Sequence, residues 1–97
     1  MVANNGYTID NGASLVTLTL PATAAYGTLL QVIGVSAGGW SIAQNAGQNI
    51  LVSGVSTTTG TGGSLSSTIP SDQVQLLCVV ADTTWVAIAP AASLTYV

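Results

Sequence analysis

Apolar and polar residues alternate along much of the chain with a period of two, the spacing of side chains on one face of a β-strand. In residues 14–20, for example, Val16, Leu18 and Leu20 share one face. Helical spacing is hard to find, and Val, Ile, Thr and Gly dominate the composition of these stretches. The pattern predicts an all-β chain with eight or nine short strands. The expected strands span residues 7–10, 14–20, 28–35, 40–44, 48–53, 64–69, 74–80, 84–89 and 93–97.

Turn-forming residues separate these expected strands. Residues 10–12 (Asp-Asn-Gly) are typical of a hairpin, and residues 38–39 (Gly-Gly) and 82–83 (Asp-Thr) lie between later strands. The prolines, each closing a strand, are Pro21, Pro70 and Pro90. Residues 54–63, rich in Thr and Gly, predict one extended and flexible loop.

The same order of elements occurs twice. Residues 6–9, a Ser-Leu pair, a proline, an apolar strand and a four-residue turn lead to Trp40. Residues 47–50 open a second series of the same kind, which leads to Trp85. The order therefore suggests an internal duplication.

The predicted architecture follows from the length and this duplication. A chain of 97 residues fits one domain, residues 1–97, because a second core would be too small to be stable. The two copies would span residues 6–46 and 47–90, followed by a terminal strand at 91–97. We expect a β-sandwich or β-prism with a pseudo-twofold internal repeat, and a short β-solenoid is the alternative.

Ionisable side chains are almost absent. Lys plus Arg is 0, His is 0, and the acidic residues are Asp10, Asp72 and Asp82. Nucleic-acid binding requires cationic side chains, which this chain lacks. Nucleotide-binding loops, metal–histidine sites and Ser-His or Cys-His catalysis also need residues that the sequence does not contain. The composition therefore predicts neither an enzyme nor a cofactor or metal site.

Apolar residues make up 48% of the chain but do not form long runs. The longest run, residues 76–81, is far shorter than the roughly 20 residues of a membrane helix. Residues 1–10 are polar and lack the basic start of a signal peptide. We therefore expect no membrane insertion. The single Cys78 can form no internal disulfide and is expected to be a small buried side chain.

The composition also predicts association between copies of the chain. Soluble β-proteins protect open strand edges with lysines, inward charges, prolines or bulges, and this chain has no lysine. Leu77 and Val79 add apolar side chains to the second face of their strand. We expect neighbouring copies to cover such surfaces, in a trimer or a filament. Residues 93–97 are expected to close their own sheet or to be donated to a neighbour.

Stability should depend little on pH, because the three carboxylates have no side-chain cation to pair with. Apolar burial and hydrogen bonds between strands then supply the stability. We expect an assembly that resists acid, salt and trypsin, since trypsin cleaves after Lys or Arg and the chain contains neither.

Three strings together resemble a small β module of bacteriophage tail-fibre and related extracellular fibre or surface proteins. They are GGWSIAQNAGQNI at residues 38–50, TTTGTGGSLSST at 57–68 and VQLLCVV at 74–80, and the resemblance extends over residues 14–97. It implies a non-enzymatic, all-β, trimeric element that is extracellular or on a virion surface. Such modules are expected to carry charges on their outer strands. This chain departs from that expectation, which leaves open a filament whose subunits cover nearly all of those faces.

Trp40 borders a polar stretch that contains Gln44, Asn45, Gln48 and Asn49. An indole face can stack on a sugar ring, and side-chain amides can bond to its hydroxyls. These five residues are therefore the candidate ligand or interface contacts. Core packing is the alternative for the tryptophan, and amide ladders between stacked subunits are the alternative for the others.

The carboxylates are expected to form turns, although an ion at a subunit interface, held by Asp10 or Asp72, is an alternative. No carboxylate pair indicates a hydrolase. The predicted function is a structural, self-assembling module of an extracellular fibre. The alternative is a tip domain that binds a host-surface glycan or receptor through loops 44–49 and 54–63.

Overall fold

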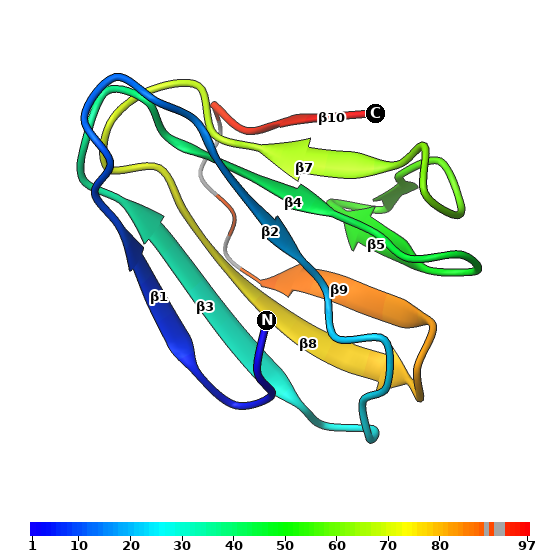
Figure 1. Ribbon diagram of the computed structural model, residues 1–97. Coiled ribbons are helices and arrows are strands. Elements are labelled where there is room, and N and C mark those ends of the chain that lie inside the picture. The colour runs from blue at the N-terminus through cyan, green and yellow to red at the C-terminus, as the bar shows by residue number, and fades with distance from the viewer. Residues whose placement is uncertain (89, 91–92) are drawn as a thin grey trace.

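All regular secondary structure in the described part of the chain is β-strand (Figure 1). The computed structural model describes residues 1–88, 90 and 93–97. Its strands are β1 (Gly6–Ile9), β2 (Val16–Thr19), β3 (Leu29–Gly34), β4 (Trp40–Ala43), β5 (Asn49–Val52), β6 (Val55–Ser56), β7 (Ser64–Ser66), β8 (Gln73–Val80), β9 (Thr84–Ile88) and β10 (Thr95–Tyr96). The all-β prediction is confirmed.

The strands form two mixed sheets that face one another as a sandwich. One sheet has six strands in the order β1-β3-β8-β9-β5-β6, and the other has four in the order β10-β7-β4-β2. Three pairs are parallel, namely β1 with β3, β2 with β4, and β5 with β9. Each parallel pair joins segments that are far apart in the sequence. In the described residues, no helix is long and apolar enough to cross a membrane.

Alternation within the strands produces a core between the sheets. In β3, Leu30 and Val32 are buried, whereas Leu29 and Ile33 point to the outer face. Burying apolar area contributes about 25 cal/mol per Å², so this cluster is the main source of stability. Its members are Ile9, Leu20, Ala24, Leu30, Val32, Trp40, Ile42, Ile50, Leu65, Val74, Leu76, Cys78, Trp85 and Ala87.

The stretch 54–63 is more structured than expected, and this raises the strand count to ten in the described residues. It contains β6, which pairs with β5 through a two-residue turn at Ser53 and Gly54. The φ angles of these two residues are 50° and 86°, the left-handed values that a tight hairpin requires. The stretch also contains Thr57, which is buried. The expectation of one extended loop over residues 54–63 is therefore wrong, because β6 interrupts it, and the flexibility expected there stays a prediction.

The turn sequences do not all form hairpins. Residues 10–12 connect β1 to β2, which lie in different sheets, so the hairpin expected there is wrong. Residues 38–39 likewise connect β3 to β4 across the sandwich. Residues 82–83 do join the antiparallel pair β8 and β9, with φ of 63° at Asp82. A turn sequence thus predicts a reversal of the chain but not the sheet to which the chain returns.

The two halves of the proposed duplication pair their strands differently. β3 and β4 lie in different sheets, whereas β8 and β9 are neighbours in one sheet. The duplication itself stays a prediction.

In residues 93–97, β10 pairs with β7, so the expected closing strand is confirmed there. The remaining residues of the expected strands, Ala89, Ala91 and Ala92, lie outside the described residues.

Candidate functional site

The side chain of Gln44 lies at the centre of a buried network of hydrogen bonds. Its Nε2 is 2.7 Å from the main-chain oxygen of Gln48, and 2.9 Å from those of Thr58 and Gly60. The hydroxyl of Thr57 donates to its Oε1 and accepts a hydrogen bond from Ile50 N at 2.9 Å. Gln44 therefore holds the connection after β6 against the start of β5. Its polar atoms are occupied within the chain.

Gln48 extends this network toward the loops that follow β2 and β8. Its Oε1 accepts a hydrogen bond from Asn45 N at 2.8 Å. Its Nε2 lies 2.8 Å from Pro21 O and 3.2 Å from Asp82 O. Asn45 Nδ2 donates to Leu20 O at 2.8 Å. Both amide side chains therefore tie distant loops of the chain together.

Asn49, like Asn45, is partly exposed, but its side chain is also engaged. Its Nδ2 donates to Ser56 Oγ, and its Oδ1 accepts a hydrogen bond from Thr84 Oγ1, both at 2.9 Å. The structure thus brings Gln44, Asn45 and Gln48 together with one another, and holds Asn49 between β6 and β9. In this chain all four amides act as connections between strands and loops.

Both tryptophans lie in the core, with exposed fractions of 0%. Trp40 donates its indole N–H to Asp72 O at 3.1 Å. Trp85 Nε1 is buried and has no hydrogen-bond partner among the described residues. Of the two roles that the sequence left open for Trp40, this burial supports core packing.

Asp72 is a buried carboxylate that organises the connection between β7 and β8. Its Oδ2 accepts hydrogen bonds from Thr68 N at 2.7 Å and Ile69 N at 3.2 Å, and Ser93 Oγ donates to its Oδ1. Burial raises the pKa of Asp72, but the hydrogen bonds from Ser93, Thr68 and Ile69 outweigh burial and hold the pKa below its ordinary value. Asp72 thus forms a turn, as expected. Stability should nevertheless fall in acid, so the expectation of pH-independent stability is revised.

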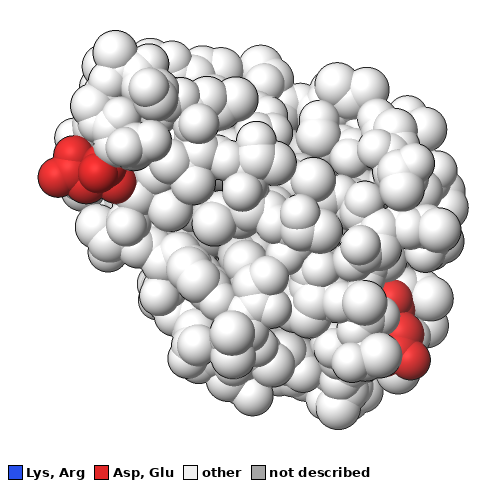
Figure 2. Space-filling view, in the orientation of Figure 1, with Lys and Arg blue, Asp and Glu red and all other residues white. Residues whose placement is uncertain are grey.

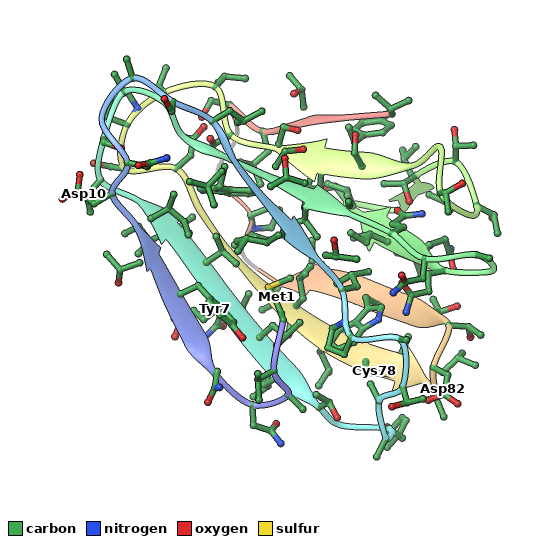
Figure 3. The ribbon with its side chains drawn as sticks, viewed as in Figure 1. Met1, Tyr7, Asp10, Cys78 and Asp82 are labelled. Carbon is green, nitrogen blue, oxygen red and sulfur yellow. The ribbon has the colours of Figure 1, made fainter. Side chains whose placement is uncertain are left out.

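The three carboxylates do not form a common site. Asp82 Oδ1 accepts a hydrogen bond from Ala24 N at 2.7 Å, and Asp10 is exposed after β1. Figure 2 shows two acidic patches at opposite ends of one face, where Figure 3 labels Asp10 and Asp82. Among the described residues, no group of three or more His, Cys, Asp or Glu could hold a metal ion.

Cys78 is buried, and burial raises the pKa of its thiol.

The outer face of the six-stranded sheet is uncharged and carries a row of apolar side chains beside polar ones. One row of apolar side chains crosses four neighbouring strands, with each residue directly opposite the next. The row consists of Leu29 in β3, Leu77 in β8, Val86 in β9 and Leu51 in β5. Leu29 is 44% exposed, and the other three are partly exposed. A second row, formed by Gln31, Gln75 and Ile88, runs beside it. We call this surface the outer face.

A hollow of about 420 Å³ lies over the part of the outer face next to β1. Its lining residues are Gly6, Tyr7, Thr8, Gln31, Val32, Ile33 and Gln73. A smaller hollow of about 120 Å³ continues it toward Asn4 and Leu29. The two share Gly6 and Gln31, so together they form one shallow groove along the first strands of the sheet.

β1 borders this groove and forms one edge of the six-stranded sheet, with no described strand on its far side (Figure 1). Gln31 N donates to Asn5 O at 3.2 Å, and Val35 N donates to Ile9 O at 2.9 Å. Because main-chain groups alternate in direction along a strand, those of Gly6 and Thr8 point away from β3. The side chain of Tyr7 packs against the core, as does Met1 (Figure 3).

The sequence predicts apolar faces that neighbouring copies would cover, but it predicts neither this groove nor this edge. Leu77 was singled out, and it does lie on the outer face, paired with Leu29 and Val86. The groove depends on the parallel pairing of β1 with β3, which no local pattern predicts.

Comparisons of the chain with protein-family models, curated proteins and solved structures find no match.

Proposed function

We propose that this protein is a non-enzymatic structural module that assembles with copies of itself, as part of an extracellular fibre or virion surface. The observation that carries the proposal is the uncharged outer face, where Leu29, Leu77 and Val86 form a partly exposed apolar row. Charged side chains normally limit association between such surfaces. With a formal net charge of only −3, little repulsion opposes contact between copies.

The position of the charges supports this proposal. Asp10 and Asp82 lie outside the strands, in connections, and Asp72 is buried. The outer face therefore carries no carboxylate that association would desolvate. A neighbouring copy that covers this face would bury apolar area at little electrostatic cost. The resemblance to tail-fibre modules agrees with this role, and a trimer or a filament would satisfy it.

Sedimentation velocity over a wide range of protein concentration tests the proposal. We expect species larger than the 9.6 kDa chain, and we expect Leu29→Lys to shift them toward smaller sizes. Leu15→Lys is the matched control, because Leu15 is 58% exposed but precedes β2 and lies off the outer face. A wild-type chain that sediments as a monomer at every concentration would contradict the proposal.

A receptor- or glycan-binding tip is the second candidate, and the groove beside β1 is the observation that favours it. Thr8 and Gln31 offer hydrogen-bonding groups along a concave surface of the size that a sugar unit occupies. The amides of Gln44 and Gln48 are instead occupied by loop carbonyls. A glycan array in which Gln31→Ala removes a wild-type signal would support this candidate, and an array without signal would count against it.

A further inference from the structure

We propose that β1 pairs antiparallel with β1 of a second copy of this chain, across a twofold axis at Tyr7. The inference rests on the proposed function and names one contact through which the copies assemble. It places the two six-stranded sheets edge to edge, so that their outer faces lie on the same side and the two grooves meet at the axis.

The first argument is that β1 has an open and regular edge. The main-chain N–H and C=O groups of Gly6 and Thr8 point away from β3, and no strand of the described residues continues the sheet beyond β1. None of the residues Gly6–Ile9 is charged or a proline, and the pairing with β3 continues without a bulge. Charges, prolines and bulges are three of the features with which natural proteins block an open edge, and β1 lacks all three.

The second argument is that this edge is complementary to itself. In an antiparallel pair, residues that exchange two hydrogen bonds lie directly opposite each other. With Tyr7 on the axis, Gly6 of each copy lies opposite Thr8 of the other. All the outward-pointing groups of the two residues are then satisfied, in two equivalent pairs. The same surface serves both copies, as a twofold contact requires.

The third argument is the placement of charge along this edge. The same register sets Asp10 of one copy beside the segment of Asn4 and Asn5 in the other. That segment has no carboxylate, and Asn4 uses its amide oxygen to accept a hydrogen bond from Leu29 N at 3.0 Å. The two Asp10 residues stand about 20 Å apart along the strands, beyond the screening length at physiological salt.

The other sheet edges are less suited to such a contact. β6 and β10 contain two residues each. β2 has four residues, but the nitrogen of Met1 donates to Thr19 O on its open side, at 2.5 Å. β1 is therefore the edge on which a second copy can form a regular ladder.

Proline substitution on two matched edges tests the contact. Thr8→Pro removes an outward-pointing N–H and leaves the ladder to β3 intact. Thr17→Pro, on the edge of β2, is the control. Val16 N and Leu20 N donate hydrogen bonds toward β4, and main-chain groups alternate in direction, so the N–H of Thr17 points outward. Both are exposed threonines in four-residue edge strands. By symmetry Thr8→Pro removes two hydrogen bonds, so we expect the dissociation constant of the pair to rise about tenfold or more.

A cysteine cross-link tests the register without depending on a loss of binding. Gly6→Cys is free of steric conflict, because no atom lies within 4 Å of a Cβ built there. When Gly6→Cys and Thr8→Cys chains are mixed, the two cysteines lie opposite each other with Cα atoms about 5.5 Å apart, within disulfide range. Two copies of the same variant hold their cysteines on a diagonal, beyond about 7 Å. We expect disulfide-linked dimers from the mixture and few from either variant alone.

The outcomes separate this inference from the proposed function. Far-ultraviolet circular dichroism verifies that each variant keeps its β-sheet content. Loss of association in Thr8→Pro but not Thr17→Pro, together with cross-links in the mixture, supports the β1 contact. Assembly that persists unchanged in Thr8→Pro, or mixed chains that do not cross-link, overturns the β1 contact and leaves the proposed function standing. A monomeric wild-type chain overturns both.

Discussion

The indole nitrogen of Trp40 donates a hydrogen bond to the main-chain oxygen of Asp72, 3.1 Å away. The same oxygen accepts a hydrogen bond from Gly34 N at 3.1 Å. The Asp72 carboxylate accepts hydrogen bonds from Thr68 N and from the hydroxyl of Ser93. One residue therefore joins the end of β3, the start of β4, the connection before β8 and the segment before β10. This makes Asp72 the carboxylate on which the fold depends most.

We predict that acid destabilises the protein through Asp72. Its pKa in the folded chain lies below the ordinary value, so the stabilisation is fully present above about pH 3.9 and is lost as the pH falls through the folded pKa. At fixed protein concentration, the free energy of unfolding in urea should be nearly constant from pH 8 to about pH 5 and then fall.

Two asparagine variants provide the control for this prediction. Asp72→Asn should lower the free energy of unfolding at neutral pH by about 1–3 kcal/mol, because hydrogen bonds to a charged group are replaced by weaker ones. It should also flatten the acid limb of the curve. Asp10→Asn, at an exposed position, should keep that limb. An unchanged acid limb in Asp72→Asn would assign the pH dependence to another group.

The buried amide network makes a second prediction. Gln44→Ala removes the acceptor of the Thr57 hydroxyl and the side-chain donor to Thr58 O, while Gly60 O keeps its hydrogen bond from Gly63 N. We expect the free energy of unfolding to fall by at least about 2 kcal/mol, because each unsatisfied buried group costs about 1–3 kcal/mol. Asn49→Ala, at a partly exposed amide, should cost less. Additive effects of Gln44→Ala and Thr57→Val in a double-mutant cycle would show that the two side chains are not coupled.

The strands were predictable because alternation is a local property. Residues 29–34 place Leu30 and Val32 on one face whatever the partner strand is. Strand pairing is not local, because β1 pairs with β3, more than 20 residues later in the chain. Their parallel register depends on the packing of the whole sandwich. The sequence therefore predicted strand positions and the β-class, but not which turns cross between the sheets.

The candidate site failed to emerge from the sequence for a similar reason. An amide side chain has the same donors and acceptor whether it meets a ligand or a loop carbonyl, so Gln44 and Gln48 looked like binding residues. Only the return of residues 57–60 to the start of β5 shows that their partners are internal. The open edge of β1 could not be predicted from the sequence either, because it depends on which strand β1 pairs with.

A third prediction concerns Gly63, which approaches the same network. A Cβ at this position would lie 2.0 Å from Thr58 O and 2.5 Å from Gln44 Nε2. Gly63→Ala should therefore displace the network and lower the free energy of unfolding by about 1–3 kcal/mol. Gly62→Ala is the matched control, because its Cβ would meet only a methyl group of Thr58 at 4.0 Å. Equal stability of the two variants, measured by urea unfolding, would contradict this account.

The fourth prediction uses Cys78 as a probe of opening. Its thiol lies between the sheets with an exposed fraction of 0%, and its sulfur is 3.3 Å from Val80 O. Burial raises the pKa of Cys78, so the reactive thiolate is scarce in the folded chain. At pH 8 an aromatic disulfide reagent should modify the folded protein slowly, at a rate set by opening of the sandwich, and the urea-unfolded protein at once. Ala46→Cys, in the connection between β4 and β5, supplies an exposed thiol whose fast reaction verifies the reagent. Rapid and complete modification of Cys78 in the folded wild-type chain would mean that β8 and β9 separate far more readily than their burial indicates.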